Sequence, residues 1–259
     1  MRRRAAISVL VGLLALLAGA AAWAEVGQSG NVRVHFNAEF APRSLPRERP
    51  APIEVTIKGE IATTDGSHPP PLQWLEVELN RKGQISTTGL PTCTSRLLQS
   101  TGTSEALARC RGALVGRGSF TADLALGGDN PVSSGGQILA FNGRRAGKPA
   151  LLLHFFAGVP VRFTLVVPLR IGHRREGQFG TVLRARIPKL GGGFGSITEI
   201  VLTLGRRYAF AGKRRSYLSA ACSAPTGFNA AIFSFARANF RFEDGREIRS
   251  TLTRTCRVR

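Results

Sequence analysis

Acidic residues, methionine, tryptophan and tyrosine are all scarce in this chain. Of 259 residues, 16 are Asp or Glu against 36 Lys or Arg, Met occurs once, and Trp and Tyr occur twice each. So few Trp and Tyr residues argue against a carbohydrate-binding surface, which presents exposed rings of these types. The 43% of apolar residues and only 20% of charged residues argue against a disordered tail. The chain is therefore expected to be a folded, strongly basic protein with a formal net charge of +20.

Catalytic signatures are also missing. The sequence contains no G-x-S-x-G, no H-E-x-x-H, no phosphate-binding loop and no EF-hand pattern. The glycine-rich run at 191–195 lacks the later Gly of a dinucleotide fingerprint, and no helical pattern follows it, so it reads as a loop. We expect no catalytic residue, no cofactor and no metal, and a binding or structural role.

Two features keep an alternative open, a secreted hydrolase acting on envelope material. His154 lies in an apolar run and is either a buried, hydrogen-bonded core residue or a residue that faces a cleft. Glu76 and Glu78 share one face of an expected strand, where they form either an acid/base pair or its solvated side.

The N-terminus has the organisation of a secretory signal peptide. Three arginines at positions 2–4 precede an uncharged stretch at 5–22, and an Ala-Trp-Ala cleavage motif ends at Ala24. Cleavage there leaves 235 residues with a charge of +17, with Trp74 as the remaining tryptophan. The alternative is an uncleaved N-terminal membrane anchor. The sequence thus predicts a secreted or cell-surface protein.

All four cysteines follow the signal segment. An even number of cysteines in an oxidising compartment predicts two disulfides, with three pairings open. We favour Cys93–Cys110, which braces the best helical segment, and Cys222–Cys256, which ties the last strand to an earlier one. The spacings do not match a zinc-site pattern.

Strict two-residue alternation of apolar and polar side chains predicts antiparallel strands. It is clear at 31–40, 53–61 and 74–79, and Asp-Gly turns at 65–66 and 244–245 separate such segments. Further strands are expected at 120–126, 137–141, 151–156, 162–169, 181–187, 197–204, 218–222, 238–242 and 248–258. The expected fold is an all-β antiparallel sandwich.

Helical character is confined to short segments, and the domain organisation stays open. Helical periodicity appears at 95–108, and a second helical turn is expected at 228–233. A similarity between 75–81 and 200–206 indicates two duplicated halves, 25–128 and 129–259. One continuous sandwich is the alternative.

Basic clusters are the most visible remaining feature, and Arg supplies 31 of the 36 positive charges. Arginine pairs with phosphate and carboxylate groups in a bidentate manner, which predicts polyanion binding. The expected partners are anionic cell-wall polymers or lipid headgroups. Nucleic acid is not expected, because neither stacking aromatics nor a reading helix is visible. The candidate binding residues are Arg174, Arg175, Arg206, Arg207, Lys213, Arg214 and Arg215.

Four stretches, at 139–144, 149–154, 214–222 and 251–256, resemble a group of uncharacterised exported actinobacterial proteins. The resemblance covers most of the chain after the signal segment. It implies an exported, Arg-rich protein and carries no activity, ligand or site residue.

Overall fold

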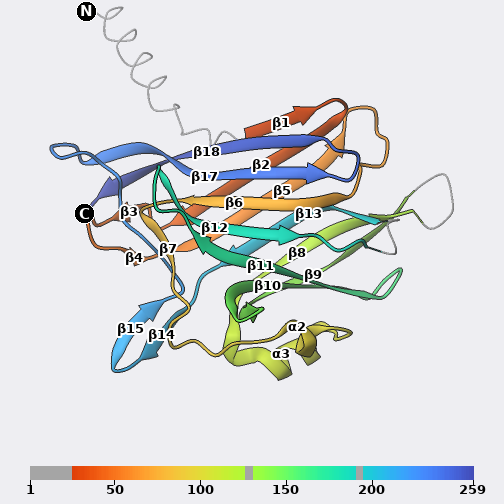
Figure 1. Cartoon of the computed structure of the whole chain (residues 1–259), viewed down its shortest axis with the longest axis horizontal. Coiled ribbons are helices and arrows are strands. Elements are labelled where there is room, and N and C mark those ends of the chain that lie inside the picture. Colours follow the sequence, from red (N-terminus) through yellow and green to blue (C-terminus); the bar gives the residue numbers. More distant parts are fainter. Residues whose placement is uncertain (1–24, 126–130, 191–194) are drawn as a thin grey trace, which may run out of the picture.

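The computed structural model describes residues 25–125, 131–190 and 195–259 and confirms the all-β class (Figure 1). The expected signal segment at 1–24, most of the residues at the expected boundary between halves, and most of the glycine-rich run lie outside the described residues. The strands are β1 (Glu25–Ser29), β2 (Val32–Ala41), β3 (Ser44–Leu45), β4 (Ala51–Pro52), β5 (Glu54–Thr63), β6 (Leu72–Asn80), β7 (Gly83–Ile85), β8 (Leu114–Leu124), β9 (Val132–Arg145), β10 (Lys148–Ala157), β11 (Phe163–His173), β12 (Phe179–Arg186), β13 (Gly195–Leu204), β14 (Arg207–Phe210), β15 (Lys213–Ser216), β16 (Leu218–Ala220), β17 (Ala230–Phe242) and β18 (Glu247–Val258). The helical elements are α2 (Ser95–Leu98), α3 (Thr103–Cys110) and the 3-10 turn η1 (Arg111–Ala113).

Thirteen strands form one sheet in the order β1-β2-β5-β13-β8-β9-β10-β11-β12-β6-β17-β18-β3. Strands from both parts of the chain alternate in this order, since β5 pairs with β13 and β6 pairs with β12 and β17. All pairings in the sheet are antiparallel except that of β18 with the two-residue β3.

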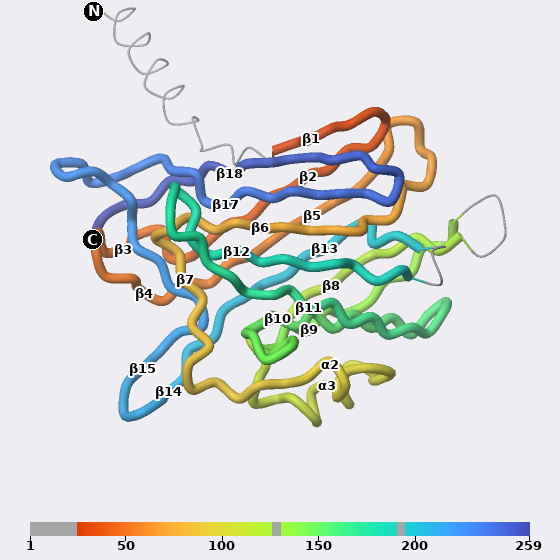
Figure 2. The backbone as a smooth tube through the Cα atoms, viewed as in Figure 1, coloured from red at the N-terminus to blue at the C-terminus, as the bar shows by residue number. Residues whose placement is uncertain are grey.

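This sheet curls until β1 at one end meets β18 near the other end, so the expected facing layers are parts of one sheet. The backbone tube in Figure 2 shows β1 and β2 beside β18 and β17, far apart in the strand order. The rings of Phe36 on β2 and Phe240 on β17 lie 5.9 Å apart across the core. A Cβ on Gly27 of β1 would overlap Ile248 of β18, so the absence of a side chain permits this approach.

Alternation in the sequence fixes which side chains enter the core. Along β2, Val32, Val34, Phe36, Ala38 and Phe40 are buried, and the intervening polar residues are half-buried. One apolar face every second residue is what a half-buried strand requires. The predicted strand at 31–40 is confirmed in this element.

Residues 138–143 of β9 and most of β10 are buried on both faces, which explains their apolar runs. Their inner side chains join the main core, and their outer side chains form a second cluster with α2, α3 and the cysteines of the Cys93–Cys110 disulfide. Phe141 and Leu152 are fully buried in this second cluster. A run such as 151–156 therefore shows no polar face, because helices cover the side that water would otherwise solvate.

The favoured disulfide pairing is confirmed: Cys93 bonds Cys110 and Cys222 bonds Cys256, and the Cα–Cα distance is 5.6 Å in both. Both bridges fit an oxidising, extracytoplasmic environment. Within the described ranges, no helix combines the length and the apolar character needed to span a membrane.

Two helical expectations need revision. The segment 95–108 forms two helices instead of one, with Ser100 at a φ of 58° between them. The helical turn expected at 228–233 is wrong, because β17 begins at Ala230 and pairs with β18 from there. The aromatic pair Phe233 and Phe235 packs against Phe40 of β2, and this tertiary contact outweighs the weak local helical pattern.

Candidate functional site: a basic end of the molecule

Three chain segments converge at one end of the molecule around residues 86–93. The Tyr208 hydroxyl of β14 donates a hydrogen bond to the Thr88 carbonyl at 2.7 Å. The Cys93 backbone N–H donates to the Asn142 carbonyl of β9 at 2.8 Å, and Cys93 is bonded to Cys110 of α3. The β14–β15 hairpin, the β9–β10 turn and the helical segment therefore surround one short connection, below the large sheet in Figure 1.

The charge of this end is almost entirely positive. These three segments carry eleven basic residues and one acidic residue, Glu105, whereas the other 15 acidic residues lie elsewhere in the chain. Glu105 is paired with Arg109 within α3. The basic residues are Arg96, Arg109, Arg111, Arg144, Arg145, Lys148, Arg206, Arg207, Lys213, Arg214 and Arg215. We call this set and its supporting segments the basic end.

The β14–β15 hairpin projects from the sheet and orients four of the predicted residues (Figure 1). Ala211 and Gly212 form its two-residue turn with φ values of 50° and 71°, as a primed turn between twisted strands requires. Directly opposed residues share a face, so Arg207 and Arg214 lie on one face with Ala209. Tyr208, Phe210, Lys213 and Arg215 lie on the other.

One face of the hairpin is anchored to the body of the protein. Tyr208 bonds to Thr88, and Phe210 packs so closely on Gly89 that a Cβ there would overlap the ring. The Arg215 guanidinium lies over the Phe210 ring at 5.6 Å from its centroid. The face with Arg207 and Arg214 consequently points away from the anchor, and both side chains are exposed.

Not every predicted arginine is free to bind a ligand. Arg206 donates to the carbonyls of Gly112 and Leu114, the latter at 2.8 Å, and thereby fixes the base of the hairpin. The ion pairs found among the described residues do not include Arg207, Lys213 or Arg214. Of the predicted binding residues, these three are the cations that the hairpin exposes to solvent.

Arg174 belongs to a different cluster, on the outer face of β6. It forms ion pairs with Glu76 at 3.2 Å and with Glu78 at 2.5 Å. Glu78 is only 3% exposed and is also paired with Arg237, whose guanidinium lies 4.6 Å from the centroid of the Phe179 ring. Arg175 is exposed next to this cluster in sequence. The structure therefore does not bring Arg174 to the basic end.

The same cluster accounts for the acid pair that sequence reasoning weighed as an acid/base site. Glu76 is bonded to Arg174 and, at 2.5 Å, to Arg184. Both carboxylates are held by guanidinium groups, from Arg184 and Arg237 on the two neighbouring strands and from Arg174 just after β11, which is an ion network and leaves neither acid unpaired.

His154 is a buried hydrogen-bonded residue on the outer face of β10. Its Nε2 lies 3.0 Å from the Thr101 carbonyl and 3.0 Å from the Thr101 hydroxyl, which itself donates to Leu98. Burial lowers the pKa of His154 below its ordinary value, because a charged imidazole would be poorly solvated there. The contact ties β10 to the connection between α2 and α3, and neither Glu76 nor Glu78 is among its hydrogen-bond partners.

Sequence reasoning missed two exposed apolar side chains at the basic end. Leu97 of α2 is 43% exposed and Phe210 beside the hairpin turn is 40% exposed. The basic end itself has a signal in the sequence, namely two long stretches with almost no acidic residue. Glu105 is the one acidic residue between Glu78 and Asp123, and no acidic residue lies between Glu199 and Glu243.

Comparisons of the chain with family models, with curated proteins and with solved structures find no match.

Proposed function

We propose that this chain is an exported, non-catalytic binding protein whose basic end docks on an anionic lipid surface. The observation that carries the proposal is the eleven-to-one excess of basic over acidic residues in three segments that meet around residues 86–93. Such a patch attracts anionic surfaces and steers encounter with them.

Lipid is favoured over a soluble anionic polymer by the apolar side chains at the same end. Leu97 stands exposed on the helical segment beside Arg96, and Phe210 is partly exposed on the anchored face of the hairpin, opposite Lys213. Apolar side chains beside Arg and Lys are typical of interfacial elements, where the rings and aliphatic groups enter the headgroup region while cations contact phosphates. A dissolved polymer offers no apolar layer for them.

The hairpin supplies a measurable part of this attraction. A Lys or Arg near an anionic bilayer contributes about 1 kcal/mol, and the contribution decreases within a Debye length of about 10 Å at 0.1 M salt. Arg207 and Arg214 share the outward face of the hairpin, so their joint replacement by glutamine should weaken vesicle binding by about 30-fold.

The direct test is cosedimentation with vesicles of phosphatidylcholine containing increasing phosphatidylglycerol. The protein should bind only the anionic vesicles, and Arg207→Gln/Arg214→Gln should lose most of that binding. The matched control is Arg186→Gln/Arg249→Gln, which removes the same charge from exposed positions on β12 and β18 and should bind nearly as wild type. Equal losses in both variants would contradict docking through the basic end.

A second comparison separates lipid from polymer. Leu97→Ser should weaken binding to anionic vesicles and leave binding to a soluble polyphosphate unchanged, because only the bilayer accommodates an exposed apolar side chain. Binding to polyphosphate without binding to vesicles would overturn the lipid proposal.

Export is proposed on the N-terminal pattern and is supported by the two disulfides. N-terminal sequencing of the exported protein should yield Glu25 as the first residue. A first residue upstream of position 24 would support the anchored alternative instead.

A further inference from the structure

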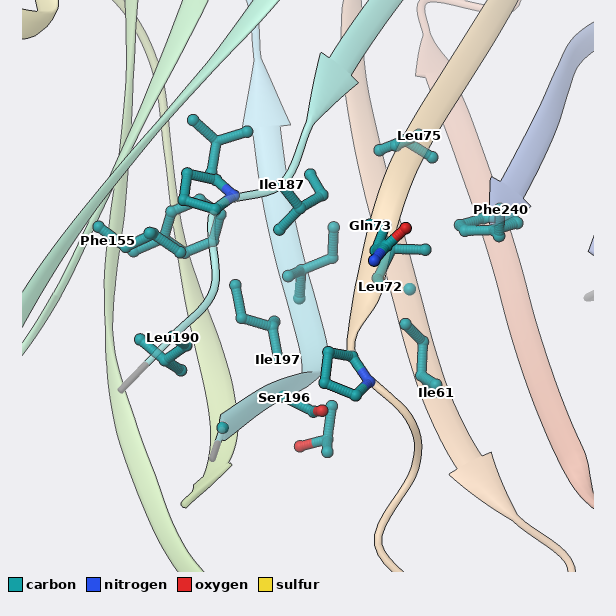
Figure 3. A pocket seen from close by; sticks show the side chains of 18 of the residues that line it. Ile61, Leu72, Gln73, Leu75, Phe155, Ile187, Leu190, Ser196, Ile197 and Phe240 are labelled. Carbon is teal, nitrogen blue, oxygen red and sulfur yellow. The ribbon is translucent and has the colours of Figure 1, made fainter. Parts of the chain in front are cut away.

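The only tryptophan after residue 24, Trp74, lies on the outer face of the large sheet. Leu75 and Val77 of the same strand pack against the main core, and Figure 3 shows Leu75 beside an interior cavity. Side chains alternate along a strand, so Trp74 points to the opposite side, together with Glu76 and Glu78. Trp74 is half-buried and belongs to neither of the two buried clusters. Core packing therefore does not account for a large ring at this position.

Two arginines flank this ring at directly opposed positions of the neighbouring strands. Trp74 pairs with Arg186 of β12 on one side and with Arg241 of β17 on the other. Directly opposed residues have Cβ atoms about 5 Å apart, so both arginine side chains begin beside the ring. Both arginines are exposed, and no guanidinium lies over the indole among the described residues. The solvent side of the ring is therefore available to a ligand.

Positive charge continues over the same face of β11, β12, β6, β17 and β18, which lie side by side (Figure 1). A second row of opposed residues crosses these five strands about 7 Å further along them. It consists of Arg170, Arg184, Glu76, Asn239 and Arg249. Glu247 of β18 completes the first row, next to Arg241. The two rows together contain five arginines and two glutamates, so the face attracts anions.

The two glutamates leave several of these arginines available. The ion pairs formed within the described ranges include neither Arg170 nor Arg186. Arg241 pairs with Glu247 at 2.7 Å, and these side chains are 52% and 36% exposed. An ion pair this exposed contributes little stability, so Arg241 can exchange Glu247 for a carboxylate of a ligand. The face thus offers three guanidinium groups to an anion, beside one indole ring.

A polysaccharide that carries carboxylates has the chemistry that fits this arrangement. Guanidinium groups bind carboxylates in a bidentate manner, and the apolar side of a sugar ring packs on an indole. A surface for neutral sugars presents several exposed rings, which the scarcity of Trp and Tyr argues against, whereas cations supply most of the contacts here. Single-stranded nucleic acid stacks successive bases on several rings, and these two rows contain one.

We propose that this outer face binds an acidic polysaccharide, with a sugar ring on Trp74 and uronate carboxylates on Arg186 and Arg241. The second row of arginines extends the contact along the polymer. The oxidising, extracytoplasmic environment that the two disulfides indicate is where such polymers are found. The site is separate from the basic end, because β6, β12, β17 and β18 are not among the segments that form that end.

The test is titration of the folded, exported protein with hexagalacturonate, followed by Trp74 fluorescence and by isothermal titration calorimetry. A sugar ring on the single tryptophan should change its emission, with the same midpoint as the heat of binding. Maltohexaose has the same number of sugar rings and no carboxylate, and it should not bind. Heat without a change in emission would place the uronate on another surface and refute the site, and an absence of binding would refute it as well.

Three variants assign the binding to this face. Trp74→Leu should weaken hexagalacturonate binding roughly three- to tenfold, the effect of losing one aromatic contact. Arg186→Gln/Arg249→Gln removes two exposed cations and should weaken it roughly three- to thirtyfold. The matched control, Arg207→Gln/Arg214→Gln, removes the same charge from the basic end and should leave the affinity nearly unchanged. Equal losses in the two double variants would show general charge attraction and refute the site.

Two further probes decide the class of polymer. Hexathymidylate and a polyphosphate of similar charge should both bind more weakly than hexagalacturonate. Tighter binding of hexathymidylate with a change in Trp74 emission would assign the face to nucleic acid, and polyphosphate binding equal to that of hexagalacturonate would show that the ring makes no contribution. Either result would overturn the polysaccharide site.

The same double variants separate this site from the proposed lipid docking. Arg186→Gln/Arg249→Gln should lose hexagalacturonate and keep anionic vesicles, whereas Arg207→Gln/Arg214→Gln should do the reverse. Failure of vesicle binding with retention of hexagalacturonate binding would refute only the proposed function. Loss of both ligands in Arg186→Gln/Arg249→Gln would refute the polysaccharide site as a separate surface.

Discussion

The two tyrosines of this chain should respond in opposite directions to the same substitution. Tyr217 is fully buried with an unpartnered hydroxyl, and its conversion to Phe removes a buried polar group that has lost its hydration. That group costs about 1–3 kcal/mol, so Tyr217→Phe should raise the free energy of unfolding by up to this amount. Tyr208 donates a 2.7 Å hydrogen bond to Thr88, and its loss in Tyr208→Phe should lower the free energy of unfolding by about 0.5–1.5 kcal/mol.

The assay is urea unfolding of delipidated protein with both disulfides intact, followed by tryptophan fluorescence. Trp74 is a suitable reporter because it lies half-buried near the start of β6, where it pairs with Arg186 of β12 and Arg241 of β17. The two variants should differ by roughly 2–4 kcal/mol, with wild type between them. Equal destabilisation of Tyr217→Phe and Tyr208→Phe would contradict this prediction. It would show that the Tyr217 hydroxyl forms a favourable interaction in the free protein.

Three further predictions concern stability. Burial lowers the pKa of His154, so as the pH falls the unfolded chain takes up a proton before the folded protein does. The free energy of unfolding should therefore decrease from pH 7.5 towards pH 5, by at most about 1.4 kcal/mol per pH unit. His154→Gln should flatten this slope in urea titrations, and an unchanged slope would assign it to other groups. Glu78→Gln should lower the free energy of unfolding by about 1–3 kcal/mol, less than for a fully buried pair because Arg174 and Arg237 are partly solvated. The matched Glu76→Gln should lower it less in the same titrations, because the Glu76 carboxylate is more exposed. The reverse order would contradict the assignment of Glu78 as the buried member of the ion network. Replacing Cys222 and Cys256 by Ser opens a 34-residue loop and should lower the free energy of unfolding by about 4 kcal/mol. The same change at Cys93 and Cys110 opens a 17-residue loop and should lower it by about 3 kcal/mol. Thermal unfolding of the two double variants checks this order, and the reverse order would contradict it.

Local patterns in the sequence predict the elements and the disulfides well. The alternation around Val34 and Phe36 reproduces β2, and the Asp244-Gly245 turn correctly joins β17 to β18. Both disulfides follow from cysteine parity and spacing. These features depend on residues close in sequence, which is why single-sequence reasoning reaches them.

Features that depend on distant strand pairings were not predictable. Nothing local indicates that β5 pairs with β13, or that β6 lies between β12 and β17. Consequently the sequence left an acid/base role open for Glu76 and Glu78, although arginines remote in sequence hold both carboxylates.

The candidate site could be predicted from the sequence only in part. The charge clusters were visible, and four of the seven predicted basic residues lie on the two strands of one hairpin. Arg174 lies in a separate cluster, which the sequence does not indicate because its ion-pair partners are remote in sequence. The contribution of Arg144, Arg145 and Lys148 became clear only through the contact of Cys93 with Asn142, which brings the β9–β10 turn to the same end.

The central claim is that the basic end, and no other surface, contacts an anionic bilayer. Hydrogen–deuterium exchange of the folded protein with and without phosphatidylglycerol vesicles tests this segment by segment. Exchange should become slower in residues 94–113, 144–148 and 206–216 on vesicle addition, with β1, β2 and β18 unchanged. Protection centred on β1, β2 and β18, or uniform exchange with bound vesicles, would contradict it.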